Sequence, residues 1–166
     1  MAFNVSAPIQ VHRLVANEAE VRGTIPLDQC PRLAGVVAKV EGETHFELRF
    51  CTNGSGRPAV VGEVSAIAWL QCQRCTEPYE QTLRSTVRVE FVDDLDTDSK
   101  EPEFEPMATV EAVTIIEIVE TELLLAIPAV PMHAVGECEI DEAYRVSEED
   151  TRRPSPFAAL KELNLK

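Results

Sequence analysis

The chain has 166 residues and a formal net charge of −14 at pH 7, and 45% of its residues are apolar. This length predicts one domain with a hydrophobic core of its own. The charge argues against DNA and anionic membranes as partners, because it repels both at long range. Direct RNA contact would need a local basic patch, since Lys and Arg supply most of the affinity for phosphate. The acidity therefore favours a basic protein partner.

The distribution of apolar residues predicts a cytoplasmic protein. The first residues show no basic stretch followed by a long apolar run, and no run reaches the length of a membrane span. The longest apolar stretch, 119–130, is interrupted by two glutamates and a proline. Five cysteines, an odd number, do not indicate a disulfide framework in that compartment.

The first half of the chain predicts a short helix, a strand and then a β-rich region. Residues 8–17 have weak helical spacing, 18–27 alternate as a strand does, and 28–33 predict a helical turn with Asp28 as its N-cap. Segments 36–51, 59–71 and 76–92 alternate with period 2, which is typical of half-buried strands. Gly42 marks a division or a bulge in the first segment, and 53–56 is a turn.

The second half predicts one main helix between irregular acidic segments. The segment 93–113 is expected to be a loop, because seven carboxylates lie between 93 and 105 and two prolines interrupt it. Residues 114–127 have helical spacing, with glutamates on the polar side, Thr114 as N-cap and Glu117 as its capping-box partner. Residues 128–154 are expected to be irregular. A short helix over 155–166 would pack on the domain or dock on a partner.

Together these elements predict an α+β fold. We expect an antiparallel sheet of five or six strands, either open or curled toward a barrel, with the main helix packed across it and short helices near both ends of the chain. A single domain would cover 1–154, and the C-terminal helix of 155–166 would follow it.

Two cysteines and a later His/Cys pair have the spacing of a zinc site. Cys72 and Cys75 lie on a tight turn between two predicted strands, and His133 and Cys138 follow the main helix. Three thiolates and one imidazole form a known ligand set for structural zinc. If they converge, zinc would pin the segment after the main helix to the hairpin tip. The alternative is a metal-free turn with two reduced thiols and a surface histidine.

The cysteines do not predict a redox-active site. Thioredoxin-like chemistry is disfavoured, because the pair lies between two strands and no βαβ pattern surrounds it. Cys30 and Cys51 are expected to fill the core, as free cysteines usually do.

Three arginines of the same hairpin are the candidate RNA contacts. Arg74 lies between the two cysteines and is expected to project outward, while Arg84 and Arg88 are spaced to share one face of a strand. With Arg57 they could form a basic patch on an acidic protein. The alternative is that these arginines pair with the surplus carboxylates.

Three stretches, taken in their order and spacing, resemble the YceD family. They are the Cys-Gln-Arg-Cys element at 72–75 followed by Pro78 and Tyr79, the run 119–133, and the closing stretch 153–160. The resemblance implies a role in making or stabilising 23S ribosomal RNA or its precursor, with no known enzymatic activity. Some relatives carry further cysteine pairs after the main helix, where this sequence has only Cys138.

We therefore expect a non-enzymatic factor for synthesis, processing or accumulation of 23S ribosomal RNA. Its partner would be 23S rRNA, the precursor of that RNA, or a basic ribosomal or processing protein. The alternative is an acidic adaptor that regulates an RNA-processing enzyme without touching RNA. The sequence contains no nucleophile elbow, phosphate-cradling glycine loop or HExxH motif, and no cofactor is expected apart from a structural zinc ion.

Overall fold

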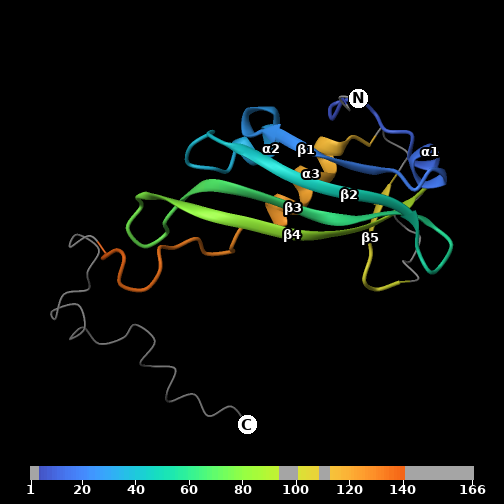
Figure 1. Ribbon diagram of the computed structural model, residues 1–166. Coiled ribbons are helices and arrows are strands. Elements are labelled where there is room, and N and C mark those ends of the chain that lie inside the picture. The colour runs from blue at the N-terminus through green and yellow to red at the C-terminus, as the bar shows by residue number, and fades with distance from the viewer. Residues whose placement is uncertain (1–3, 94–100, 109–112, 141–166) are drawn as a thin grey trace, which may run out of the picture.

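The computed structural model describes residues 4–93, 101–108 and 113–140, which form a five-stranded sheet with helices around it (Figure 1). The strands lie side by side in chain order: β1 (Glu20–Pro26), β2 (Glu43–Thr52), β3 (Pro58–Gln71), β4 (Pro78–Val92) and β5 (Glu105–Ala108). The strands β1 to β4 pair with one another in antiparallel fashion, and β5 runs parallel to β4.

Three short helical segments precede β2, and one longer helix follows the sheet. They are α1 (Val11–Ala16), the 3-10 turn η1 (Leu27–Gln29), α2 (Pro31–Ala34) and α3 (Ile115–Leu125). In Figure 1, α3 crosses behind the strands. None of the helices in the described ranges is long and apolar enough to cross a membrane.

Strict alternation along the strands gives the sheet one buried face. In β2, side chains 44, 46, 48 and 50 are buried and the residues between them are exposed. Neighbouring side chains of a strand point to opposite faces, so this pattern turns one face toward a core and the other toward solvent. The core joins Phe46, Leu48 and Phe50 to Ile118 and Leu123 of α3. The predicted α+β class, with one main helix packed on the sheet, is confirmed.

The start of α3 follows the predicted capping box. The Glu117 N–H donates to Thr114 Oγ1 at 3.2 Å, and the Thr114 N–H donates to a Glu117 side-chain oxygen at 2.8 Å. These two bonds satisfy backbone donors that the first turn of a helix leaves free. The helix therefore begins at Ile115, beside the predicted N-cap.

Two expectations about the sheet need correction. The sheet does not close into a barrel, because β1 and β5 are its two edges and do not pair. It is also not fully antiparallel, since the parallel strand β5 lies inside the stretch predicted as an acidic loop. This four-residue strand contains Pro106. It shows no hydrophobic alternation, and proline is compatible with an edge strand because its missing N–H can face away from the sheet.

Three local expectations were also wrong. Residues 36–42 do not form a strand and make only one isolated bridge, between Lys39 and Trp69. Asp28 makes no capping bond; α2 instead begins with Pro31 after Cys30. Cys51 is only half-buried, whereas Cys30 lies in the core as expected.

The glutamates of α3 do not all lie on a solvent-exposed side. Two of them are buried, because α3 is covered by the sheet on one side and contacts α2 on another. Glu120 accepts a 2.9 Å hydrogen bond from the Leu33 N–H, and Glu122 accepts one of 2.7 Å from the Ser85 hydroxyl. The predicted C-terminal helix, 155–166, and residues 141–154 of the predicted irregular segment lie outside the described residues.

Candidate metal centre

The hairpin between β3 and β4 brings the four predicted metal ligands together. The chain leaves β3 through a tight turn at 72–75, which we call the knuckle. The turn is closed by a 2.9 Å bond from the Thr76 N–H to the Cys72 carbonyl. The segment after α3 runs alongside, where the Gln73 N–H donates to the Pro131 carbonyl at 2.8 Å. This contact places the later His/Cys pair beside the knuckle.

The ligand atoms lie at distances close to those of a tetrahedral zinc site. The Sγ atoms of Cys72 and Cys138 lie 3.8 Å apart, and Cys75 Sγ lies 3.4 Å from His133 Nδ1. All four ligand atoms lie within 4.8 Å of one another. Zn–S bonds of about 2.3 Å and Zn–N bonds of about 2.0 Å at tetrahedral angles give edges of about 3.8 Å between sulfurs and about 3.5 Å between sulfur and nitrogen. The cluster can therefore hold a metal ion such as zinc.

The local electrostatics favour a thiolate at Cys72. Burial by itself would raise the pKa of this thiol. Hydrogen bonds from the backbone of Cys75, His133 and Arg74 and from the His133 side chain oppose that effect and lower the pKa to about 5. The thiolate is the form of cysteine that binds metal.

The second thiol of the knuckle shows the opposite trend. Burial raises the pKa of Cys75, and the neighbouring thiols of Cys138 and Cys72 raise it further. Ionised sulfurs this close together would repel one another. A divalent cation removes that repulsion, because its own charge becomes the largest in the site.

Arg74 is turned toward the candidate ligands and does not project outward. Its Nε–H donates to Cys138 Sγ at 3.0 Å, and its Nη2 donates to the carbonyls of His133 and Ala134, both at 3.1 Å. Its backbone N–H also lies 3.4 Å from Cys72 Sγ. One arginine thus contacts both halves of the ligand set. The hydrogen bond to Cys138 is the main cause of the raised pKa of its guanidinium.

Tyr79 is a further residue of this site that the periodicity of the sequence does not reveal. Its ring packs against the imidazole of His133, with ring centroids 4.8 Å apart. The ring therefore supports the histidine from the start of β4. In the sequence, Tyr79 could have been singled out because it belongs to the stretch that resembles the YceD family.

The other candidate arginines lie on the open face of the sheet. Arg84 and Arg88 are both exposed on the same face of β4, as their spacing predicted. Arg88 forms an ion pair with Glu103, and Arg57 forms one of 2.7 Å with the buried Glu90. Arg84 makes no ion pair with a described residue. The expected alternative, pairing with carboxylates, therefore holds for Arg57 and Arg88.

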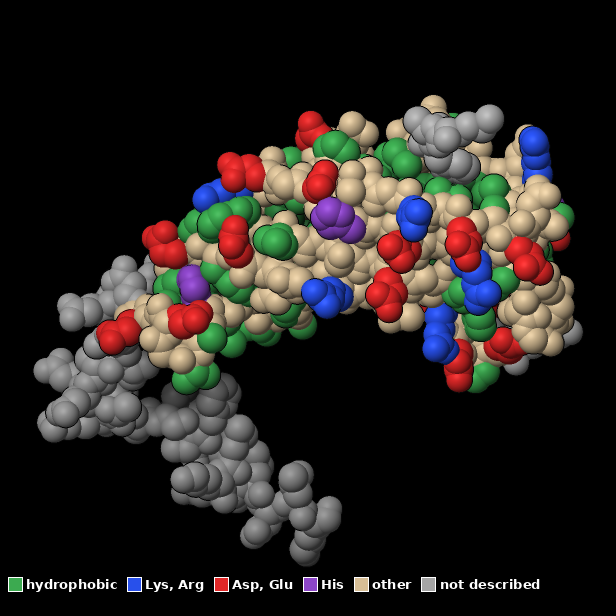
Figure 2. All heavy atoms as spheres, viewed as in Figure 1, with side chains coloured by type: hydrophobic (Ala, Val, Ile, Leu, Met, Phe, Trp, Pro, Cys, Tyr) green, Lys and Arg blue, Asp and Glu red, His purple; other side chains and the backbone are tan. Residues whose placement is uncertain are grey.

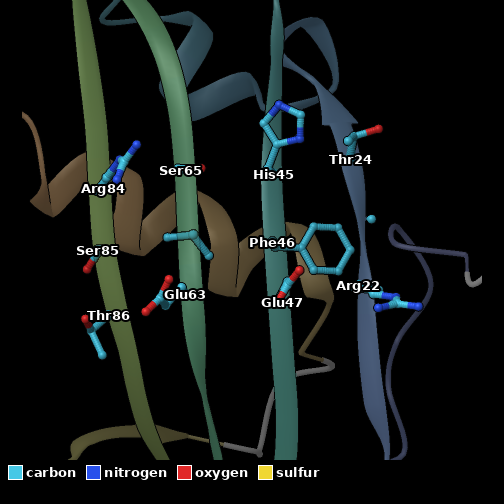
Figure 3. A pocket seen from close by; sticks show the side chains of 12 residues that line it. Arg22, Thr24, His45, Phe46, Glu47, Glu63, Ser65, Arg84, Ser85 and Thr86 are labelled. Atoms are coloured by element: carbon cyan, nitrogen blue, oxygen red, sulfur yellow. The ribbon is translucent and has the colours of Figure 1, made fainter.

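Arg84 lines a broad, shallow cavity of about 710 Å³ on that face (Figure 3). The strand register places Thr24, His45 and Ser65 in one row with Arg84, across four strands. The neighbouring row, from β1 to β4, consists of Arg22, Glu47, Glu63 and Thr86. Acidic and basic side chains are thus mixed here, and the face is not a uniform basic patch.

Comparison with known proteins identifies the family. Residues 60–164 match the family model described as "Large ribosomal RNA subunit accumulation protein YceD". This span includes the knuckle, α3 and all four candidate ligands. The chain belongs to the YceD family.

A curated YceD relative supports the same assignment over a longer range. The protein from Haemophilus influenzae named "Large ribosomal RNA subunit accumulation protein YceD" is 35% identical over 151 residues, which is 87% of each chain. No solved structure matches this chain. The resemblance noted in the sequence is confirmed, and the YceD match includes most of β3, all of β4 and the segment that carries His133 and Cys138.

Proposed function

We propose that this chain is a non-enzymatic factor for the accumulation of large-subunit ribosomal RNA, acting on the synthesis, processing or stability of 23S rRNA. Membership of the YceD family carries this proposal, since the matched relative covers most of both chains under that name. The ligand set supports a non-enzymatic role. Three thiols and one imidazole fill the four positions of tetrahedral zinc, whereas catalytic zinc keeps a position open for water or substrate.

Deleting the gene for this chain tests the cellular role. We expect the ratio of 23S to 16S rRNA to fall, because large-subunit RNA would no longer accumulate normally. Wild-type chain supplied from a plasmid should restore it. The measurement is quantitative northern blotting or RNA sequencing of total RNA in exponential growth. An unchanged ratio in the deletion strain would refute the proposed function.

We also propose that the four-residue cluster binds one structural zinc ion, through Cys72, Cys75, His133 and Cys138. The packing of the segment after α3 supports this. No residue between 128 and 140 is fully buried, so hydrophobic contacts contribute little to its position. A structural zinc site can supply apparent binding energy of about 10–16 kcal/mol, which becomes folding energy when the ligands lie far apart in the chain. Bound zinc would supply a cross-link between the segment and the knuckle.

Elemental analysis of the purified chain tests the zinc proposal. We expect about one zinc per wild-type chain prepared under reducing conditions, and less than about a tenth of that for Cys72→Ser, because three ligands hold zinc far less tightly than four. Cys51→Ser is the matched control and should retain the metal, since this half-buried cysteine lies outside the cluster. Metal-free wild-type protein would refute the proposal.

A second candidate function is that of an acidic adaptor that reaches RNA processing through a protein partner. Two ion pairs and the inward orientation of Arg74 favour it. Of the arginines predicted to contact RNA, Arg74 donates to the metal cluster and Arg88 is paired with Glu103. Phosphate affinity depends on available cations. Of the three arginines predicted to contact RNA, Arg84 alone makes neither an ion pair nor a hydrogen bond to the metal cluster among the described residues.

A further inference from the structure

Exposed large hydrophobic side chains gather at one end of the sheet. All those in the described residues, apart from Leu125, lie on three segments: 36–43, 67–80 and 128–140. They are Val36, Val40, Ile67, Val130, Met132, Val135 and Ile140. Soluble proteins rarely cluster such residues without a binding role. We call the exposed side chains of these three segments the hairpin-end surface.

The three segments are held together at the tip of the β3–β4 hairpin. The Ala38 N–H donates to the Trp69 carbonyl at 2.6 Å, which ties the first segment to the end of β3. On the other side, the bond between Gln73 and Pro131 ties the third segment to the knuckle. Figure 1 shows both segments at the same end of the sheet, and Figure 2 shows hydrophobic and acidic side chains there together.

The charge of this surface is acidic, and its cations are already engaged. The three segments contain six exposed glutamates: Glu41, Glu43, Glu77, Glu80, Glu137 and Glu139. Their Lys and Arg residues are Lys39 and Arg74. The Lys39 ammonium lies 3.7 Å from the centroid of the Trp69 ring, and Arg74 donates to Cys138. RNA phosphates would meet carboxylates here, whereas a basic protein surface would find complementary charge.

Val135 occupies the most prominent position on the surface. Its side chain is 98% exposed, and Gly136 follows it with a φ of +90°, a backbone conformation that glycine adopts easily. His133 and Cys138 lie at the two ends of this turn, so a metal ion bound by the candidate metal centre would fix both ends. An apolar side chain presented on a pre-organised turn is suited to insert into a partner, because little order is lost on binding.

From these observations we propose that the hairpin-end surface docks a basic amphipathic segment of a protein partner. Apolar side chains of that segment would cover Val135 and its neighbours, and its Lys and Arg residues would face the six glutamates. This inference rests on the proposed function and names the class of partner through which the chain acts. It places the partner at the knuckle end of the molecule, including the end of the open face where Ile67 lies, and not over the row of side chains that contains Arg84.

Site-specific photo-crosslinking of the full chain in living cells tests the inference. Benzoylphenylalanine is placed in the position of Val135 and, as the matched control, in that of Thr52. Thr52 is exposed at the end of β2 that lies away from the hairpin-end surface. We expect at least tenfold more protein crosslinking from the first position. The crosslinked peptide, identified by mass spectrometry, should contain an excess of Lys and Arg together with apolar residues.

Capture of that same partner by tagged chain provides the second readout. Ile67→Asp should lower capture at least tenfold, because it places a charge among the exposed apolar side chains, whereas Thr52→Asp should leave capture unchanged. Raising NaCl from about 0.05 M to about 0.5 M should also lower capture at least tenfold, since salt screens exposed charges. Both substituted positions are exposed in the folded chain, so folding is not at risk.

The inference is overturned if position 135 crosslinks to RNA, to residues 141–166 of the same chain, to a second copy, or to a neutral or acidic peptide. Absent crosslinking, or capture that is insensitive to salt and to Ile67→Asp, overturns it as well. Its failure is distinguishable from failure of the proposed function. The ratio of 23S to 16S rRNA in the deletion strain tests that function without reference to any surface.

Discussion

At the scale of single residues, Arg74 shows how one side chain can suggest two different roles. Its place between two cysteines on an acidic chain suggested a contact for phosphate. In the structure its guanidinium donates to one candidate ligand and to the carbonyls of His133 and Ala134. Groups that hydrogen-bond to metal ligands orient them and tune their charge. Arg74 is therefore a positioning residue for the proposed zinc site.

Replacing Arg74 tests this role. We expect Arg74→Gln to weaken zinc binding by about 10–100-fold, the usual effect of losing a partner of a metal ligand. Arg74→Lys should lose less, because it keeps the charge although it lacks the planar fork of donors. Competition with a chromophoric chelator measures the affinity. Arg84→Gln serves as control, and a zinc affinity of Arg74→Gln within about twofold of wild type would contradict the role.

Glu122 is a buried carboxylate with a pH-dependent effect on stability. Burial raises its pKa, the hydrogen bond from Ser85 opposes the rise, and the charge of Glu105 adds to it. A carboxyl group with a raised pKa in the folded state stabilises the fold fully only below its unfolded pKa. That stability is lost as pH rises through the folded pKa.

Glu122→Gln should remove this loss, since the amide stays neutral. Relative to wild type, the variant should gain stability as pH rises above the unfolded pKa, near 4.3, in urea unfolding measured from about pH 3.5 to about pH 7.5. Glu47→Gln makes the same change of charge at an exposed position and provides the control. A difference from wild type that is constant across this pH range would argue against a raised pKa.

At the scale of elements, the pairing of β2 with β3 depends on one glycine. Gly62 lies opposite Leu48, and a Cβ atom built on it would stand 2.0 Å from the Glu47 carbonyl oxygen. The obstruction is backbone, so it cannot turn away as a flexible side chain can. The sequence placed a strand here, but the close approach of the neighbouring backbone could be seen only in the folded sheet.

Gly62→Ala should therefore destabilise the chain strongly. We expect a loss of about 1–3 kcal/mol or more, the range found for overpacked sites. Urea unfolding measures this loss. Gly35→Ala is the matched control, because a Cβ there would meet its nearest atoms at 3.4 Å or more. Equal stability of the two variants would show that β2 and β3 separate easily at this point.

At the scale of the whole molecule, the open sheet leaves two edges that must avoid pairing with other chains. The β1 edge carries charged residues and ends in Pro26, and the β5 edge is four residues long and includes Pro106. Short strands, charges and prolines are the usual protection of sheet edges. An open sheet is thus compatible with a single chain, and the expected curling toward a barrel is unnecessary.

The sequence by itself determined the class of fold, the main helix and the four candidate ligands. Periods of 2 and 3.6 residues are set by backbone geometry, and a Cys/His ligand set is recognisable from spacing. Only the tertiary structure decided the parallel strand β5, the burial of Glu120 and the inward turn of Arg74. Each of these depends on contacts between residues far apart in the chain. Local periodicity carries no information about which distant segment will meet a given side chain.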